Sequence, residues 1–440
     1  MKHYGNARRA ALQVLIDFRQ RPVSFREKKI YNRLQGLPPQ EKALAVQLVY
    51  GVLQNYYKLD ACIRLASKTG KIQPQARDIL RLGVYQLLFL NRIPKSAAVD
   101  ESVKLAKLIK LPAAAQSFIN AVLRNVSKWD KTPVFDELWE EYSHPEWLVK
   151  IFIEEFGLER TEDILKFNNT VPPAYIQILE LEIRDKLIAA GAEEHPDGCL
   201  TYRGSVDALP GYKEGAFIIA DNAARLAVGI AAPQTGERVL DACAAPGGKS
   251  VMLWHKTHIS LVCCDKYPYK VVELKETLAK HGMDGVECMV ADAREFKPEF
   301  ESAFDLVLAD VPCSGFGVIR KKPDIRYKNP EHYEPLIRAQ REIIDNLSRY
   351  VAPNGRLVYV TCTVLRRENQ EIIRDFLDNH PDFELQAFDT PFGSAPDGMF
   401  ITPFVERDID GFFYAKLGRC PAGQCGGIPP RPQKQGVTND

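Results

Sequence analysis

The sequence has no uninterrupted apolar run long enough to cross a membrane, which takes about 20 residues. Residues 1–9 carry three cations and no apolar segment of the kind that begins a secretory signal. Ten cysteines in 440 residues are too few for a disulfide scaffold, and none of them belongs to a Cys-x-x-Cys pair of the kind that binds zinc. We therefore expect a cytoplasmic protein with reduced thiols, no metal and no membrane segment.

Two glycine-rich nucleotide-binding patterns are missing as well. The dinucleotide fingerprint GxGxxG does not occur. Gly248-Lys249-Ser250 matches the end of the phosphate-loop pattern GxxxxGK[ST], but Cys243 stands where the first glycine is required. The small residues of this turn still let a ligand approach the backbone N–H groups. The turn therefore fits an adenosine ligand without a pyrophosphate, and S-adenosylmethionine is the common one.

Two acids follow the next two predicted strands. Asp265 ends the strand Ser260–Asp265, at the position where an acid binds ribose hydroxyls in nucleotide-binding α/β folds. Asp292 follows the strand Val286–Val290 and is placed to accept from the adenine amino group or a nearby N–H. Each acid alone could cap a helix, but their positions at successive strand ends favour the cofactor.

The net charge of +1 conceals an asymmetry between two parts of the chain. Residues 1–130 hold 23 Lys and Arg against 8 Asp and Glu, whereas the remainder holds 35 against 49. A strongly basic region predicts a polyanionic partner, most simply nucleic acid. The alternative is a helical surface that is merely solvated.

The apolar pattern divides the chain into four parts. Residues 1–130 repeat with the helical period, and 131–215 are a mixed connector with a capping box, Ser143-His144-Pro145-Glu146, before a helix. From 216 to 419 strands alternate with helices, as a mostly parallel α/β sheet requires. Residues 420–440 are rich in Gly, Pro and Gln, which predicts a disordered tail. Strands of the sheet are expected at Arg238–Ala242, Ser260–Asp265, Val286–Val290, Phe304–Asp310, Arg356–Thr361 and Phe383–Ala387.

An acid and two cysteines follow two of these strands. Asp310 ends one strand and Cys313 comes three residues later, while Cys362 directly follows the strand Arg356–Thr361. Ligands of open α/β sheets bind at the carboxyl ends of the strands. A buried inert thiol is the ordinary interpretation of a single cysteine, but two thiols beside one acid indicate a reactive site.

Three motifs, Asp241 to Lys249, Asp310 to Gly315 and Thr361-Cys362-Thr363, resemble those of the RNA cytosine-C5 methyltransferases. Nearly all of residues 1–418 are similar to the bacterial members that modify small-subunit ribosomal RNA. The resemblance implies a Rossmann-like class I methyltransferase domain with a mostly parallel seven-stranded sheet over 216–419. It also implies an all-α NusB-like RNA-binding domain over 1–130 and a small α+β connector over 131–215.

The chemistry of this family explains why such a site needs two thiols and an acid. C5 of cytosine is a poor nucleophile, and a thiolate that adds to C6 makes C5 reactive toward an activated methyl group. By resemblance, Cys362 is the nucleophile and Cys313 assists release of the product. Asp310 is placed to hydrogen-bond the base at N3 and N4. The residues expected to bind S-adenosylmethionine are Cys243, Ala244, Ala245, Pro246, Gly247, Gly248, Lys249, Asp265, Asp292 and Asp310.

The segment after Cys313 is unusually basic for this half of the chain. Its five cations, with Tyr327 among them, predict contacts with the backbone and bases of a flipped-out RNA segment; they are Arg320, Lys321, Lys322, Arg326 and Lys328. A solvated loop is the alternative.

We therefore expect a monomeric enzyme that acts on small-subunit ribosomal RNA before the subunit is assembled. One alternative is the same chemistry on transfer RNA. Another is an RNA-binding protein whose methyltransferase fold is only a scaffold, which the presence of both cysteines and Asp310 argues against.

Overall fold

The structure is a computed structural model that describes residues 6–20, 33–67 and 71–421. The chain divides into two compact units. The helical unit comprises residues 1–171 and 319–332, and the sheet unit comprises residues 172–318 and 333–440. The short segment 319–332 therefore belongs to the helical unit, although it follows Cys313 in the sequence.

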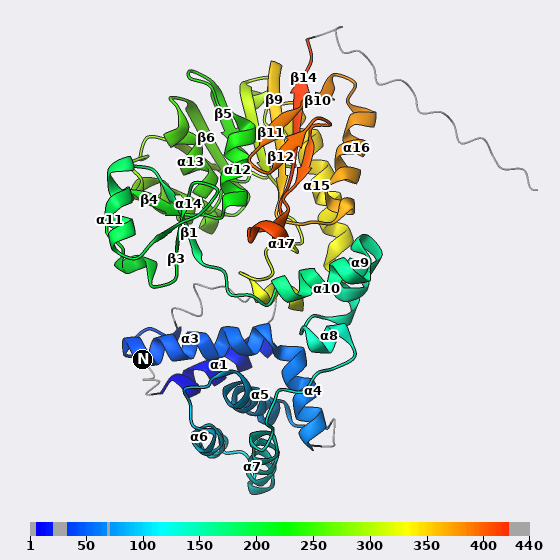
Figure 1. Ribbon diagram of the computed structural model, residues 1–440. Coiled ribbons are helices and arrows are strands. Elements are labelled where there is room, and N and C mark those ends of the chain that lie inside the picture. The colour runs from blue at the N-terminus through cyan, green and yellow to red at the C-terminus, as the bar shows by residue number, and fades with distance from the viewer. Residues whose placement is uncertain (1–5, 21–32, 68–70, 422–440) are drawn as a thin grey trace, which may run out of the picture. The chain divides into compact units, whose positions relative to one another are not determined.

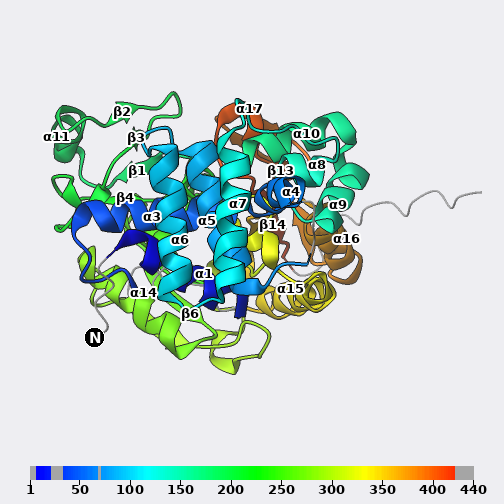
Figure 2. The same ribbon diagram turned by 90° about the horizontal axis from the view of Figure 1, so that it is seen from below.

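The helical unit is built on a helix bundle, two of whose helices begin at a proline. Pro39 and Pro74 each occupy the first turn of a helix, where the missing N–H would have no partner inside the helix. Helices α5, α6 and α7 pack against one another, and α5 also contacts α1, α3 and α4 (Figure 2). The helices are α1 (Ala7–Gln20), α3 (Pro39–Gln54), α4 (Tyr56–Ser67), α5 (Pro74–Phe89), α6 (Lys95–Leu108) and α7 (Ala113–Ser127).

Three helices of the sequence-predicted connector also belong to the helical unit: α8 (Leu138–Glu141), α9 (Glu146–Phe156) and α10 (Leu158–Phe167). The predicted capping box is wrong, because Pro145 is the N-cap of α9 and no side chain caps it. Ser143 Oγ instead accepts a hydrogen bond from the backbone N–H of Tyr57 at 3.0 Å. His144 is fully buried, and its ring contacts the carbonyl of Tyr142 at 2.7 Å.

The rest of the connector forms a small antiparallel sheet in the sheet unit, with the strand order β2-β3-β1-β4. Its core contains Ile176, Leu187, Leu200 and Phe217. This part of the connector therefore contains both helix and strand, as expected for the small α+β connector. The elements are β1 (Ala174–Ile178), α11 (Arg184–Ala189), β2 (Glu193–Glu194), β3 (Leu200–Tyr202) and β4 (Phe217–Ile219).

The main sheet has the strand order β10-β14-β9-β8-β5-β6-β7, with β13 also paired to β14. Figure 1 labels β5, β6, β9, β10 and β14 of this sheet. The ladders from β9 through β8, β5 and β6 to β7 are parallel, whereas β14 is antiparallel to its neighbours. This confirms the mostly parallel sheet, but the sheet has eight strands and not the expected seven, because β13 also pairs with β14. The strands are β5 (Arg238–Asp241), β6 (Ser260–Asp265), β7 (Glu287–Val290), β8 (Phe304–Asp310), β9 (Val351–Thr361), β10 (Phe383–Leu385), β13 (Met399–Ile401) and β14 (Phe413–Arg419).

Helices cover both faces of the main sheet, as the alternation along β14 shows. Phe413 and Ala415 pack into an apolar cluster with residues of α15 and α16, whereas the hydroxyl of Tyr414 donates to the carbonyl of Ala223 in α12. α12 also contacts α13, and α13 contacts α14. The helices are α12 (Asn222–Ala231), α13 (Gly248–Lys256), α14 (Pro268–Lys280), α15 (Tyr333–Ser348) and α16 (Gln370–Asn379).

Two smaller elements complete the sheet unit: the hairpin β11 (Phe388–Thr390) with β12 (Gly393–Ala395), and the short helix α17 (Phe404–Arg407). Eight of the described cysteines are free, but Cys420 is disulfide-bonded, contrary to the expectation that all thiols are reduced. In the described part of the chain, no helix combines the length and the apolar character that a bilayer span requires. Most of the predicted tail, residues 422–440, lies outside the described residues.

Candidate active site

The two predicted reactive thiols meet at the carboxyl ends of two adjacent parallel strands. β8 and β9 pair in register with Asp310 opposite Val360, so the residues that follow both strands emerge side by side. The backbone N–H of Val311 donates to the carbonyl of Val360 at 3.1 Å, which continues the ladder past the strand end. Cys313 Sγ lies 3.2 Å from Cys362 Sγ. This distance permits a hydrogen bond between the thiols.

Gly317 holds the Cys313 loop against the residue that bears the other thiol. Its N–H donates to the carbonyl of Cys362 at 3.0 Å, and its carbonyl accepts from the N–H of Gly411 at 2.8 Å. A Cβ at Gly317 would lie 1.8 Å from the carbonyl oxygen of Gly411. Only glycine therefore fits at this position.

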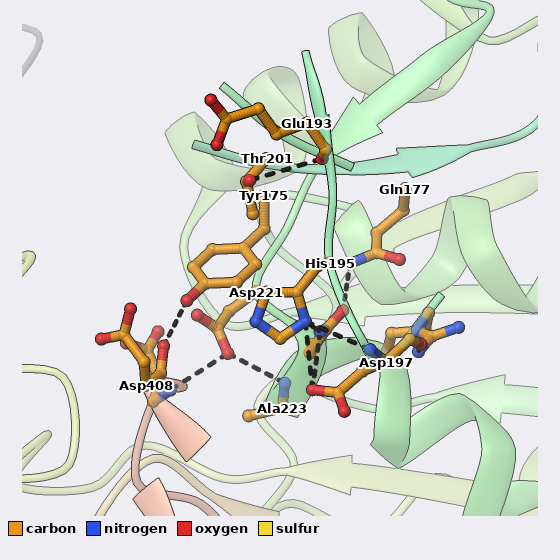
Figure 3. A network of polar contacts seen from close by, with 12 residues as sticks. Tyr175, Gln177, Glu193, His195, Asp197, Thr201, Asp221, Ala223 and Asp408 are labelled. Carbon is orange, nitrogen blue, oxygen red and sulfur yellow. Dashed lines mark hydrogen bonds and ion pairs between the residues drawn. The ribbon is translucent and has the colours of Figure 1, made fainter. Parts of the chain in front are cut away.

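Gly411 is in turn positioned by the start of α12. Asp221 Oδ1 accepts from the N–H of Ala223 at 2.9 Å, which caps α12, and from the N–H of Asp410 at 3.1 Å (Figure 3). The hydroxyl of Tyr175 in β1 donates to the carbonyl of Asp408. The small antiparallel sheet and α12 thus both hold the segment that precedes β14, and that segment supports the thiol loops.

Asp310 forms an ion pair at the same edge of the sheet. Lys249 Nζ lies 2.6 Å from Asp310 Oδ2, with side-chain exposures of 14% and 28%. Burial is the largest influence on Lys249 and disfavours its charged form. The charge and hydrogen bond of Asp310, together with the charges of Asp241 and Cys362, outweigh burial and raise the pKa of the lysine. A cation therefore lies within electrostatic range of both the predicted base-binding acid and the predicted nucleophile.

The pKa of the Cys313 thiol is raised well above its ordinary value. Its hydrogen bond to Cys362 is the largest cause, followed by burial and by the negative charges of Cys362 and Glu368. The Cys362 sulfur and burial thus favour the protonated form of the Cys313 thiol.

The turn between β5 and α13 has the geometry of a nucleoside-binding loop. The N–H of Ala244 donates to the carbonyl of Cys264 at 2.8 Å, which fixes the turn beside β6. Gly247 has φ = 111°, and a Cβ there would lie 3.0 Å from Leu274 Cδ1. α13 begins at Gly248, so its first N–H groups have no partner inside the helix and can meet a ligand.

Three acids surround this turn. Asp241 ends β5 and is almost fully buried; its Oδ2 accepts from Ser250 Oγ at 2.7 Å, while its Oδ1 has no hydrogen-bond partner among the described residues. Asp265 ends β6 with Lys270 Nζ 3.5 Å away. Asp292 follows β7 and pairs with Lys266 at 2.9 Å and Arg294 at 2.6 Å. A buried polar atom without a partner is what a polar ligand would satisfy, so these residues fit S-adenosylmethionine.

Burial contradicts the prediction that Arg320 and Arg326 contact RNA. Arg320 is 5% exposed and lies over the ring of Phe167 at 4.3 Å. Arg326 is fully buried in the helical unit, and burial lowers its pKa to about 10. Its guanidinium donates to the carbonyls of Gln54, Ser143 and Asn168 and to Asn169 Oδ1, at 2.7 to 2.9 Å.

The other three cations of this segment, Lys321, Lys322 and Lys328, stay predicted RNA contacts. Lys322 and Lys328 are exposed, and Lys321 is half-buried.

In residues 6–20, 33–67 and 71–421, no group of three or more His, Cys, Asp or Glu side chains is arranged to hold a metal ion.

Sequence reasoning missed Asp221 and Glu368. Glu368 is fully buried and accepts hydrogen bonds from the residue that follows Cys313. Its only signal was an acid six residues after Cys362 in an otherwise apolar and basic stretch. Asp221 had the local pattern of an N-cap before an apolar helix, but its bond to Asp410 connects residues 189 positions apart.

Each of the two units contains a region that matches a known protein family. Residues 228–418 match the family model described as 16S rRNA methyltransferase RsmB/F, and residues 5–128 match the NusB family. The ribosomal RNA small subunit methyltransferase B of Klebsiella pneumoniae is 35% identical over 403 residues, which cover 87% of this chain and 91% of that protein. The enzyme of the same name from Vibrio cholerae is 34% identical over 407 residues, with coverages of 88% and 91%.

The chain belongs to the RsmB/F family of 16S rRNA methyltransferases. As a member, it is an S-adenosylmethionine-dependent enzyme that methylates 16S rRNA at C5 of cytosine, which confirms the predicted family, activity and NusB-like domain. The ribosomal substrate is favoured over the transfer RNA alternative.

Solved structures share the fold. The crystal structure of PH0851 aligns with a TM-score of 0.77 at 24% identity, over 93% of this chain and 98% of that chain. NSun6 from Pyrococcus horikoshii aligns with a TM-score of 0.55 at 18% identity, over 63% of this chain and 98% of that chain.

Proposed function

We propose that this RsmB/F member methylates its target cytosine by covalent catalysis, with Cys362 as the nucleophile and Cys313 as the thiol that assists release. The observation that carries the proposal is the 3.2 Å separation of the two sulfur atoms at adjacent strand ends, beside the Lys249–Asp310 pair. If these loops had only a structural role, hydrogen bonds between amide or hydroxyl groups would be enough to hold them. Two thiols and a charged pair at the ligand-binding edge of the sheet serve acid–base and nucleophilic chemistry.

In the first step, the thiolate of Cys362 forms a bond to C6 of the cytosine and the C5=C6 double bond opens. Electron density then accumulates on C5 and on the N3 and N4 edge of the ring. The carboxylate of Asp310 accepts a hydrogen bond from the N4 amino group at that edge and fixes the orientation of the ring. Lys249 places a positive charge within electrostatic range of Cys362, whose negative charge is among the causes that raise the pKa of the lysine.

S-adenosylmethionine, when bound, supplies an electrophilic methyl group for C5. The β5–α13 turn would hold the adenosine portion, with the first N–H groups of α13 and the buried carboxyl group of Asp241 available to its polar atoms. Asp265 would bind the ribose hydroxyls, and Asp292 would receive an N–H of the adenine. The turn residues that would line this site are Cys243, Ala244, Ala245, Pro246, Gly247 and Gly248.

Release of the methylated base requires loss of the proton on C5 and cleavage of the bond between C6 and the Cys362 sulfur. The proton departs to solvent, its electron pair re-forms the C5=C6 double bond, and the C6–S bond breaks to give the Cys362 thiolate. The thiol of Cys313 donates a hydrogen bond to that sulfur and stabilises it as it leaves. The raised pKa of Cys313 supports this role, since the thiol must carry its proton when the bond breaks.

The test is methyl transfer from labelled S-adenosylmethionine to 16S rRNA transcribed in vitro, followed by mapping of 5-methylcytosine. Cys362→Ala should lower transfer by about 10⁴-fold or more, as loss of a nucleophile does in other covalent enzymes. Cys288→Ala is the matched control, because Cys288 is a half-buried cysteine of β7 away from the proposed thiol pair. Retention of activity by Cys362→Ala would overturn the assignment.

We also propose that the enzyme acts in the cytoplasm as a monomer on 16S rRNA before the small subunit is assembled. The cytosine must leave its stack to reach a strand-end site, and ribosomal proteins would hinder this in the finished particle. Free 16S rRNA should therefore be methylated faster than assembled subunits. Equal rates on both would contradict the proposal.

A further inference from the structure

Glu368 is a buried carboxylate that is joined to the Cys313 loop. It ends the short 3₁₀ turn Arg366–Glu368, six residues after Cys362, and none of its surface is exposed. Burying an isolated charge costs several kcal/mol unless hydrogen bonds compensate for it. An apolar side chain would be the cheaper choice at a position that served packing alone.

Four donors converge on the two oxygens of Glu368. Oε2 accepts from the backbone N–H of Ser314 at 2.8 Å and from Gln340 Nε2 at 2.9 Å. Oε1 accepts from Ser314 Oγ at 2.5 Å and from the hydroxyl of Tyr333 at 3.2 Å. An ionised carboxylate accepts only, so it satisfies all four of these neutral donors at once.

These bonds hold the backbone on both sides of Cys313. Gln340 Nε2 also donates to the carbonyl of Pro312 at 3.0 Å, while Glu368 holds the N–H of Ser314. The hydroxyl of Ser314 also lies 2.8 Å from Thr363 Oγ1, which follows the other thiol. The carboxylate therefore lies at the centre of a network that fixes the two cysteine loops relative to each other.

We infer that Glu368 is a positioning residue that holds Cys313 at the sulfur of Cys362 for the release step. The inference rests on the proposed roles of the two cysteines. Glu368 touches neither the base nor the cofactor in this account, and it acts through Ser314 and Gln340. The negative charge of Glu368 also contributes, after the Cys362 hydrogen bond and burial, to the raised pKa that keeps the Cys313 thiol protonated.

The central test is whether Glu368→Gln traps the covalent intermediate. The glutamine has nearly the same shape, but its NH₂ group would face N–H and O–H donors from which the carboxylate now accepts hydrogen bonds. Displacement of Cys313 should slow turnover by about 100-fold. It should also leave an RNA adduct through Cys362 that survives denaturing gel electrophoresis. Glu237→Gln is the control, since Glu237 is a half-buried carboxylate of the same unit that pairs with Arg356 at 2.7 Å, outside the thiol network; it should leave no adduct.

A double variant separates positioning from a general effect on the fold. In the Cys313→Ala background, Glu368→Gln should change the adduct lifetime little, because the group that it positions is already absent. A further large change in that background, or a slow Glu368→Gln enzyme without adduct, would overturn the inference. If Cys313→Ala itself gave no adduct, the proposed cysteine roles would fail instead, so the two failures are distinguishable.

Ser314→Ala gives a second test if Glu368→Gln does not fold. It removes the hydroxyl that joins Glu368 Oε1 to Thr363 but keeps the backbone N–H bond. A smaller adduct signal of the same kind is expected. Its absence, with a normal thermal unfolding midpoint, would count against the inference.

Discussion

Arg326 in the helical unit and Glu368 in the sheet unit are both fully buried charges, and each collects four hydrogen bonds from chain segments that are distant in sequence. Arg326 donates to three carbonyls and an amide of the helical unit, whereas Glu368 accepts from the residues around the Cys313 loop. Arg326 therefore contributes to fold stability, and Glu368 to the geometry of a reactive thiol. The difference teaches that the neighbours of a buried charge, and not its sign or its place near a motif, indicate its role.

The largest expected effect on stability comes from removing the Arg326 guanidinium. Arg326→Met keeps most of the aliphatic stem but leaves four acceptors without their donor, and two of these bonds are fully buried. The free energy of unfolding should fall by about 3–5 kcal/mol, as it does when one partner of a buried polar network is lost. Denaturant unfolding of the full chain measures this.

Lys322→Ala is the control for that experiment, because Lys322 is an exposed cation of the same segment. Its free energy of unfolding should change by less than about 0.5 kcal/mol. Equal effects of the two substitutions would remove the distinction between a structural and a surface cation.

The next effect concerns the pH dependence of stability and belongs to the cofactor turn. Burial is the main cause that raises the pKa of Asp241 from 3.8 to about 7. The folded protein therefore keeps a proton that the unfolded chain loses across this window, so this group makes the protein less stable as the pH rises from about 4 to 7. The slope reaches about 1.4 kcal/mol per pH unit.

Asp241→Asn should remove this component. Thermal or denaturant unfolding of both proteins between pH 4 and pH 7 gives the difference in slope, while the other carboxylates cancel in the comparison. Parallel plots of unfolding free energy against pH for the two proteins would contradict this prediction, because Asp241 would then be ionised in the folded protein across this range.

The smallest expected effect concerns the exposed cations that follow Cys313. If Lys322 and Lys328 contact phosphates, each alanine substitution should reduce the slope of log affinity against log salt for 16S rRNA by about 1. Lys150→Ala is the control, since Lys150 is exposed, pairs with Glu146 at 2.7 Å and lies outside this segment. An unchanged slope in the double variant would place the RNA contact elsewhere.

Much of the site could be predicted because it depends on local patterns. The expected strands Ser260–Asp265 and Phe304–Asp310 have the observed bounds, since apolar runs that end in an acid mark buried parallel strands. Strand ends then bring Asp310 and the two cysteines together, because neighbouring parallel strands end at the same edge of the sheet.

The remainder depended on contacts that no local pattern encodes. Arg326 looked like an RNA ligand because a cluster of cations is usually solvated, yet its acceptors lie 157 or more positions away. Ser143 had the spacing of a capping box, but φ = 55° at this residue and its bond to Tyr57 direct the side chain elsewhere. Glu368 could not be assigned, because the donors around it are defined only by the packing of the Cys313 loop, α15 and the turn after β9.

The central claim, that Cys362 attacks and Cys313 releases, is tested most directly by trapping the enzyme on RNA. Cys313→Ala, Cys362→Ala and the wild type would each be incubated with 16S rRNA and S-adenosylmethionine and resolved on a denaturing gel. The account predicts a stable protein–RNA adduct with Cys313→Ala and none with Cys362→Ala. An adduct formed only by Cys362→Ala would contradict it and exchange the roles of the two thiols.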